Sequence, residues 1–190
     1  MHVENTLTIE RPIEEVFEYA STPENDPTWV PASIRNQRTL PGPMRVGMTT
    51  EETVKLFGRT SRDTFEVIEY DSPTVVAYRA TSGPLSGLVV RVRCEPALGD
   101  GTSLTHEVEW EPRSLYYKAI LPLMMLVLPR LLASMDQTLK DMLEGNPATP
   151  SQRHRVAPGT GLVGGGAVAV VLLTLYLLLR RRSGARRRWR

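Results

Sequence analysis

The 190-residue sequence has few of the side chains that bind metals or form disulfides. It contains one cysteine, Cys94, and only three histidines. A single cysteine cannot form a disulfide within the chain, which is typical of a protein from a reducing compartment. The cysteine and the histidines lack the spacing of metal ligands, and no phosphate-binding or nucleophile motif is present. We therefore expect no metal and no cofactor.

Acidic residues are missing from the last quarter of the chain. Residues 146–190 contain nine arginines and no aspartate or glutamate, whereas residues 1–145 carry all 21 acidic residues and the other 14 basic ones. The formal charge of residues 1–145 is therefore −7, which gives no electrostatic reason to expect nucleic-acid binding. The N-terminus also lacks the basic and apolar regions of a signal peptide, so we expect no export of this domain.

Residues 1–145 show the pattern of a domain with one antiparallel sheet. Residues 2–9 alternate between apolar and polar side chains, which predicts a half-buried strand. Pro12 then begins a short helix. Six further strands, separated by turns that contain glycine or proline, are expected at 33–40, 48–57, 60–70, 74–81, 87–95 and 102–111. Because such short connections join antiparallel neighbours, we predict a meander and no parallel sheet.

The last two predicted strands indicate which face of the sheet is buried. Residues 88, 90, 92 and 94 share one apolar face of the first, and Leu104, His106, Val108 and Trp110 share one face of the second. The opposite faces place Arg91 and Arg93 near glutamates of the partner strand. A slip of one residue would bury these charges, so we predict that the face with His106 points inward.

The stretch 115–143 predicts a long helix. In its second half, Leu128, Leu131, Met135, Leu139 and Met142 recur every three or four residues as an apolar stripe, and Asp136 falls among the polar residues between them. Its first half is apolar all round from 119 to 128, which predicts burial on more than one side.

The opening of the chain carries a family resemblance. Residues 9–17, IERPIEEVF, place a proline between an apolar strand end and a Val-Phe helix, and Pro27, Thr28, Trp29 and Pro31 follow. With the order strand, helices, six strands and long helix, residues 1–145 resemble the START-like (SRPBCC) superfamily of polyketide cyclases/dehydrases and lipid-transfer proteins. The resemblance implies an α+β helix-grip fold, in which a curved antiparallel sheet of about seven strands surrounds a long C-terminal helix.

Such a fold implies a cavity between sheet and helix that an apolar molecule occupies. The superfamily includes binders, carriers and enzymes, so the resemblance does not decide whether this chain is catalytic. The residues that we predict to line the cavity and bind the ligand are His106, Trp110, Tyr78, Tyr116, Met124, Leu128 and Met135.

His106 is the one candidate catalytic residue. It lies in the middle of a predicted strand, on the inward face, where it can act as an acid or base on a ligand. The alternative is a core histidine whose ring bonds a backbone carbonyl or water, and no acidic neighbour on the same face is evident to orient it. For the tyrosines the alternative is simple amphipathic packing.

The C-terminal quarter predicts a membrane anchor. Residues 146–160 contain three prolines and no periodicity, which is typical of a disordered linker. Residues 161–179 contain 18 uncharged, largely apolar residues from Leu162 to Leu179, enough for a single transmembrane helix. The tail 180–190 contains seven arginines, which favour anionic lipid headgroups. A nucleic-acid-binding tail is the rival interpretation.

Two sequence signals for the orientation of this anchor conflict. Arginines after a single span favour a cytoplasmic tail, whereas the missing export signal favours a cytoplasmic domain. A single span places the domain and the tail on opposite sides of the membrane, so both signals cannot hold. We expect the domain to be on the cytoplasmic side.

Three functions fit the sequence. The preferred one is membrane-tethered binding or transfer of a lipid-like or polyketide-like molecule. The second is a cyclase or dehydratase that uses His106 as acid or base. The third is a regulatory membrane protein whose domain binds a partner. Binding without catalysis is the favoured interpretation.

Overall fold

The structure of the chain is a computed structural model that describes residues 1–56, 59–112 and 115–145. The chain divides between Thr149 and Pro150 into two units, of which only the first contains described residues. The predicted linker 146–160, membrane helix 161–179 and tail 180–190 therefore lie outside the described residues. Within the three described ranges, no helix is both long enough and apolar enough to cross a membrane.

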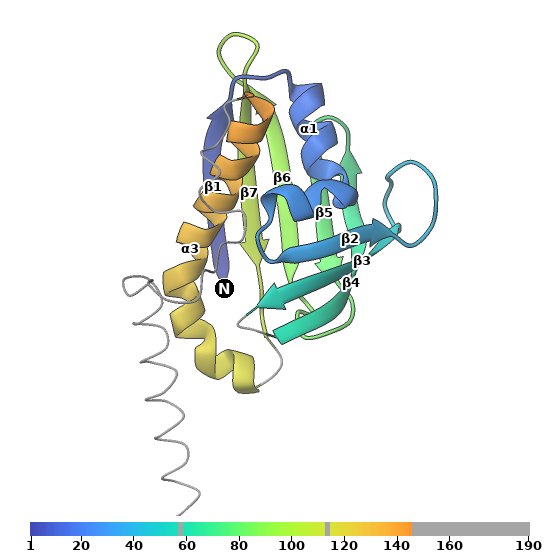
Figure 1. Ribbon diagram of the computed structural model, residues 1–190, viewed down its shortest axis with the longest axis vertical. Coiled ribbons are helices and arrows are strands. Elements are labelled where there is room, and N and C mark those ends of the chain that lie inside the picture. The colour runs from blue at the N-terminus through green and yellow to red at the C-terminus, as the bar shows by residue number, and fades with distance from the viewer. Residues whose placement is uncertain (57–58, 113–114, 146–190) are drawn as a thin grey trace, which may run out of the picture. The chain divides into compact units, whose positions relative to one another are not determined.

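Seven strands form one antiparallel sheet, which confirms the predicted α+β class and the number of strands. Their order across the sheet is β1-β7-β6-β5-β4-β3-β2. The strands are β1 (His2–Ile9), β2 (Ser33–Arg38), β3 (Thr49–Leu56), β4 (Arg59–Asp71), β5 (Val75–Ala80), β6 (Val89–Pro96) and β7 (Thr102–Glu109). In Figure 1, β2, β3 and β4 run almost crosswise to β1, β7 and β6, so the sheet is strongly twisted.

The helices lie between the first two strands and at the end of the domain. Helix α1 (Ile13–Ser21) follows Pro12, which stands just before the helix instead of at its first position as predicted. A short 3₁₀ helix, η1 (Pro23–Asn25), and a single turn, α2 (Asp26–Trp29), lead to β2. Helix α3 (Leu115–Leu143) has the predicted bounds and packs mainly along β1, with a smaller contact to α2 (Figure 1).

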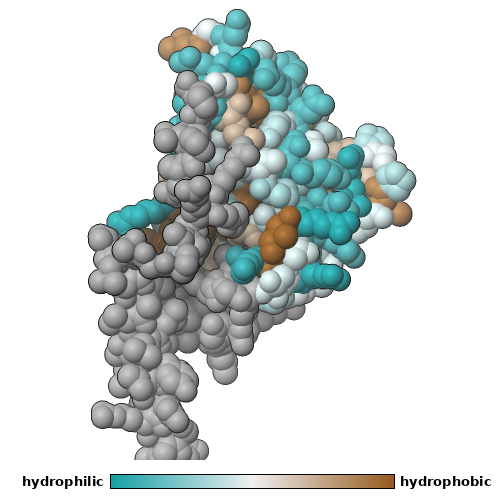
Figure 2. Space-filling model, viewed as in Figure 1, coloured by the Kyte–Doolittle hydropathy of each residue, from teal (hydrophilic) through white to brown (hydrophobic). Residues whose placement is uncertain are grey.

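The inner, concave face of the sheet holds the core. The predicted inward residues Leu104, His106, Val108 and Trp110 are all buried, with at most 7% of each exposed. Helix α1 packs Val16, Phe17 and Ala20 against the same core. On the face of the domain seen in Figure 2, hydrophobic side chains form small separate spots instead of one patch.

The first half of α3 differs from the prediction. Met125, Leu126 and Val127 are 43%, 62% and 38% exposed, so the prediction that this half is buried on more than one side is wrong for these residues. The physical reason is that α3 packs mainly along β1, at one edge of the sheet, because the sheet twists away from the helix instead of closing around it.

On the outer face, arginines lie opposite glutamates as predicted. Arg91 pairs with Glu107 at 3.2 Å and with Glu69 at 2.9 Å, and Arg93 also pairs with Glu107. Glu107 is not an exposed residue, however, because only 7% of it remains accessible beneath the two guanidinium groups. These charges therefore form a partly buried network instead of isolated surface pairs.

The network gives a stability prediction. Glu107→Ala removes the common partner of Arg91 and Arg93, which leaves two cations side by side. We expect a loss of about 1–3 kcal/mol in the free energy of unfolding, since one side of a partly buried ion pair is removed. Urea denaturation followed by circular dichroism measures it. The control is Glu109→Ala, which changes an exposed residue of the same strand and is expected to shift stability by about 0.5 kcal/mol at most. Equal losses in the two variants would contradict the network.

Candidate functional site

The centre of the site is a buried histidine–aspartate pair. His106 on β7 places its Nδ1 2.8 Å from Oδ1 of Asp136 on α3. The other carboxylate oxygen, Oδ2, accepts a hydrogen bond of 2.8 Å from the side-chain amide of Asn5 on β1. Asp136 is fully buried and His106 is 3% exposed. The first strand, the last strand and the last helix of the domain therefore meet at one carboxylate.

The local structure explains why these groups meet. Asn5 and His106 are direct partners in the antiparallel register of β1 and β7, so their side chains stand next to each other on the concave face. A buried carboxylate is costly unless hydrogen bonds satisfy its oxygens, and these two side chains supply one bond to each oxygen.

The pair has the arrangement of an oriented acid or base. When Asp136 is ionised, Nδ1 of His106 carries a proton that it donates to the carboxylate, and the opposite nitrogen Nε2 then holds a free lone pair. Among the described residues, none hydrogen-bonds Nε2. The ring of Trp29 on α2 lies 5.9 Å from the histidine ring, centroid to centroid, at an interplanar angle of 56°. The site thus places a histidine held by a carboxylate beside an aromatic ring.

Asp136 is the residue that the sequence analysis placed wrongly. It was assigned to the polar side of the helix, and no acidic neighbour was expected for His106. The buried stripe of α3 is Leu132, Asp136, Leu139 and Leu143 at spacings of four, three and four, whereas Met142 is 38% exposed. The spacing of three and four residues also fits this buried stripe. A stripe made only of apolar residues lies about one position away around the helix, and it leaves Asp136 on the polar side.

Tyr78 and Trp110 lie on the inner side of the sheet, with their polar atoms bound to backbone. The Tyr78 hydroxyl donates to the Ser21 carbonyl at 2.8 Å, and Trp110 Nε1 donates to the Ser86 carbonyl at 3.3 Å. Burial, followed by the nearby Asp26 carboxyl, raises the pKa of Tyr78 well above its usual value, so the hydroxyl stays protonated. A ligand would therefore meet the rings of these residues more readily than their polar atoms.

The predicted helix residues lie along α3. Met124, Leu128 and Met135 are half-buried. Leu128 packs against a small cluster formed by Val3, Val108 and Leu132, while Met135 packs against the main core. The side chain of Tyr116 is outside the described part of the helix. The ligand-binding role of these four residues stays a prediction.

A second group of polar residues on the concave face was not predicted. Asn36 on β2 pairs in register with Glu52 on β3, which pairs with Asp63 on β4. Asp26 on α2 accepts a hydrogen bond of 2.7 Å from the Asn36 amide. Within the described ranges, no group of three or more acidic, histidine or cysteine side chains is placed to hold a metal ion. We call Asp26, Asn36, Glu52 and Asp63 the inner polar row.

The inner polar row perturbs its own carboxyl groups. Burial, followed by the charge of Glu52, raises the pKa of Asp26 well above its usual value. Burial also raises the pKa of Glu52, an effect that the Ser33 hydroxyl opposes and the charge of Asp63 reinforces. Both residues remain half-buried, so they lie deep in the domain without being fully enclosed.

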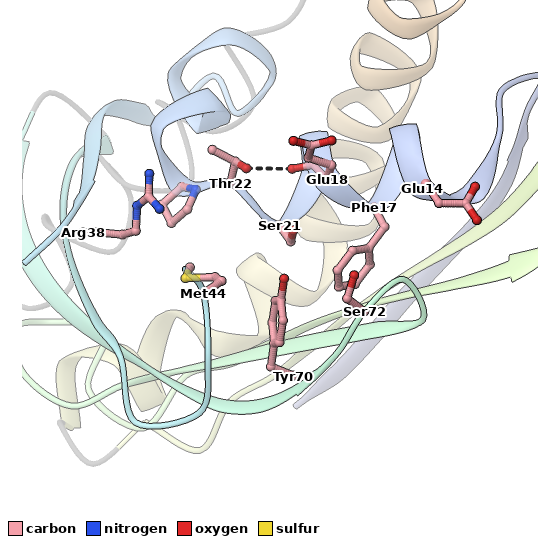
Figure 3. A pocket seen from close by; sticks show the side chains of 10 residues that line it. Glu14, Phe17, Glu18, Ser21, Thr22, Arg38, Met44, Tyr70 and Ser72 are labelled. Atoms are coloured by element: carbon pink, nitrogen blue, oxygen red, sulfur yellow. Dashed lines mark hydrogen bonds between the residues drawn. The ribbon is translucent and has the colours of Figure 1, made fainter. Parts of the chain in front are cut away.

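A hollow of about 340 Å³ lies beside α1 (Figure 3). Its walls are Glu14, Phe17, Glu18, Ser21, Thr22, Pro23, Arg38, Met44, Tyr70 and Ser72. Figure 3 shows the aromatic rings of Phe17 and Tyr70 next to each other, and their centroids are 5.7 Å apart. Neither His106 nor any other predicted ligand-binding residue lines this hollow.

Solved structures share this fold. The protein TTHA0849 from Thermus thermophilus superposes with a TM-score of 0.65 at 15% identity, over 78% of this chain and 100% of its own. The Zhui aromatase/cyclase from Streptomyces sp. R1128 gives 0.59 at 18% identity, over 75% and 95% of the two chains. A START superfamily protein from Mycobacterium smegmatis gives 0.58 at 15% identity, over 76% and 94%.

At these identities the structural matches establish the fold alone. No curated protein matches the chain. The family described as "Polyketide cyclase / dehydrase and lipid transport" matches residues 1–142, about three quarters of the sequence. The match covers every described strand and nearly all of α3, and it agrees with the START-like resemblance of the opening motif. The chain therefore belongs to the polyketide cyclase/dehydrase and lipid transport family.

Proposed function

We propose that the domain binds, and transfers, a hydrophobic small molecule of lipid-like or polyketide-like chemistry between the concave face of the sheet and α3. The observation that carries the proposal is the partial exposure of Tyr78 and Val90. These residues are register partners on β5 and β6, in the middle of the concave face, where a fully sealed core would enclose them. Their remaining exposure is what a ligand-sized space in front of the sheet requires.

The chemistry of the facing helix suits an apolar ligand. Met124, Leu128 and Met135 are half-buried on α3, so each keeps some surface that the core does not use. Methionine side chains are flexible and polarisable, and they adapt to ligands of different shape. A site with this lining favours hydrophobic contact, and its few polar groups then orient the ligand.

We also propose that a membrane anchor holds the domain near a bilayer. The support is the sequence: residues 161–179 are apolar over a length that spans a hydrocarbon core, and the arginines of 180–190 attract anionic headgroups. A flexible linker of the length of 146–160 has an end-to-end distance of about 20 Å, so the domain stays within reach of lipid. In this proposal the domain lies on the cytoplasmic side of the membrane.

Ligand binding is tested by filling the proposed space. Val90→Phe adds volume on the concave face, whereas Val89→Phe makes the same change at the neighbouring residue, which points to the other face of β6. We expect Val90→Phe to weaken binding of the neutral fluorescent probe 1-N-phenylnaphthylamine to the 1–145 fragment by about tenfold, through steric exclusion of a hydrophobic ring. Val89→Phe is expected to leave the affinity within about twofold of the parent. Circular dichroism confirms that each variant is folded.

Two results would count against the binding proposal. One is the absence of saturable probe binding by the folded parent fragment. The other is an equal loss of affinity in the two phenylalanine variants, because the effect would then not depend on the concave face.

Membrane attachment is tested on the full chain. We expect it to remain in the membrane fraction after extraction with alkaline carbonate, and a chain that ends at residue 160 to be released. With the domain in the cytoplasm, protease added to intact cells or spheroplasts is expected to leave residues 1–145 uncut. Release of the full chain by carbonate, or cleavage of the domain from outside, would refute the corresponding part of the proposal.

A second candidate function, a cyclase or dehydratase, is favoured by the orientation of His106. Its Nδ1 is held by the buried Asp136, which leaves Nε2 to accept or donate a proton on the ligand side. Removal of a proton next to a carbonyl, followed by its delivery to a leaving hydroxyl, is the chemistry that such a pair supports. Asp136 acts through His106 and is a positioning residue in this scheme.

The enzymatic alternative predicts a separation of binding from turnover. With a linear poly-β-ketone thioester as substrate, His106→Gln is expected to lower kcat by about 100-fold or more, because it removes the acid–base group. Asp136→Asn is expected to lower kcat by a smaller factor than His106→Gln does. This loss of kcat is expected to be partly separable from any change in KM. Both variants should still bind 1-N-phenylnaphthylamine. No cyclised or dehydrated product from the parent chain, or unchanged kcat in His106→Gln, would rule out this function.

A further inference from the structure

The inner polar row is made of acceptor atoms. Asn36 donates its one described side-chain hydrogen bond to Asp26, and its carbonyl oxygen Oδ1 accepts none among the described residues. Thr50, one pleat further along β3, is fully buried, and its hydroxyl likewise has no described partner. Asn36 itself is 7% exposed. Buried polar atoms are nearly always hydrogen-bonded, so the unpartnered Asn36 oxygen beside a row of carboxyl groups indicates a missing donor. The Thr50 hydroxyl can donate or accept a hydrogen bond.

The row also has no cation of its own among the described side chains. No ion pair joins Asp26, Glu52 or Asp63 to a lysine or arginine in that part of the chain. Asp63 instead accepts hydrogen bonds from the Leu85 amide at 2.9 Å and from the Ser61 hydroxyl at 3.0 Å. The row is thus rich in acceptors and in potential negative charge.

Arg38, two residues after Asn36 on β2, is already engaged. Arg38 donates to Glu24 at 2.9 Å and to the Gly42 carbonyl at 2.9 Å. The charged and titratable groups that face Asp26 are Glu52, Glu24 and Tyr78, and Arg38 faces Tyr78. Asp63 is the charged group that faces Glu52 from β4.

We propose that Asp26, Asn36 and Glu52 bind the ammonium group of an amine-bearing hydrophobic ligand. This inference rests on the proposed function, because the apolar part of the ligand occupies the space in front of Tyr78 and Val90. It adds the chemical class of the polar end and the place where that end lies.

An ammonium group fits the row better than other polar groups do. It offers three hydrogen-bond donors and a positive charge, which match the Asn36 carbonyl oxygen and the carboxyl groups of Asp26 and Glu52. A ligand carboxylate or phosphate would place negative charge beside these carboxyls. A neutral hydroxyl group supplies one donor and leaves the charge uncompensated.

The protonation of the row follows from the same argument. Burial raises the pKa of Asp26 and of Glu52, so the empty site favours their neutral forms more than water does. A bound cation favours the ionised forms. Ammonium binding is therefore expected to tighten as the pH rises from about 5 to 8, where alkylamines remain cationic and the carboxyls lose protons.

The test compares three ligands that share one alkyl chain: octylammonium, 1-octanol and octanoate. The full-length chain in nanodiscs of zwitterionic lipid is titrated by isothermal calorimetry, with empty nanodiscs as the blank for partition into lipid. We expect octylammonium to bind about tenfold or more tightly than 1-octanol at pH 7.5, and octanoate to bind most weakly. Glu52→Gln and Asp26→Asn keep the shape of each side chain and remove its charge, so each is expected to lower the preference for the amine at least about threefold.

The matched control is Glu51→Gln, the same change at the adjacent residue, whose side chain lies on the opposite face of β3. It is expected to leave the preference unchanged. Equal binding of octylammonium and octanol by the parent chain would overturn the inference and leave the proposed function standing. Failure of all three ligands to bind would refute both. A preference for the amine that survives both Glu52→Gln and Asp26→Asn would also overturn the inference, because the ammonium would then lie elsewhere.

Discussion

The carboxylate of Asp136 is the constraint on which the architecture depends. It is completely buried, and its two oxygens are satisfied by Asn5 and His106, which come from opposite ends of the sheet-forming sequence. Those bonds require β1 to pair with β7 in one register, and they require α3 to present one face to that pair. Burial without these donors would cost several kcal/mol. The same contact thus fixes the rotation of the helix and the orientation of the histidine ring.

The fold was largely predictable because its signals are local. Glycine and proline separate each pair of strands, and the structure places every strand within two residues of its predicted ends. The opposed charges of Arg91 and Glu107 correctly indicated which face of the sheet is inward. The burial of the first half of α3 was not predictable from composition, because Leu126 is apolar and still 62% exposed. Apolar side chains show what a helix can bury, and the curvature of the sheet decides how much of it is covered.

The polar part of the site depended on contacts between distant residues, and most of it was missed. His106 stood out because it interrupts an apolar face, whereas its partner Asp136 looked like one more polar residue of an amphipathic helix. The inner polar row gave no signal at all. Strand β3 begins Thr-Thr-Glu-Glu-Thr, so neither face shows an apolar alternation. Only the register of β2, β3 and β4 shows that Glu52 faces inward with Asn36 and Asp63, while its neighbour Glu51 does not.

The pairing of β1 with β7 has a consequence for how the chain is made. Residues 2–9 cannot pair until β7 leaves the ribosome, about a hundred residues later, and Asp136 follows later still. Contacts of such long sequence separation slow folding, since a large loop closes before they form. Strand β1 is an edge strand even in the folded sheet. Until α3 emerges, no helix covers the concave face beside it. An apolar molecule, or a chaperone, that shields this face during synthesis would thus act on the nascent chain before the site exists, and ligand supply would influence the yield of folded protein.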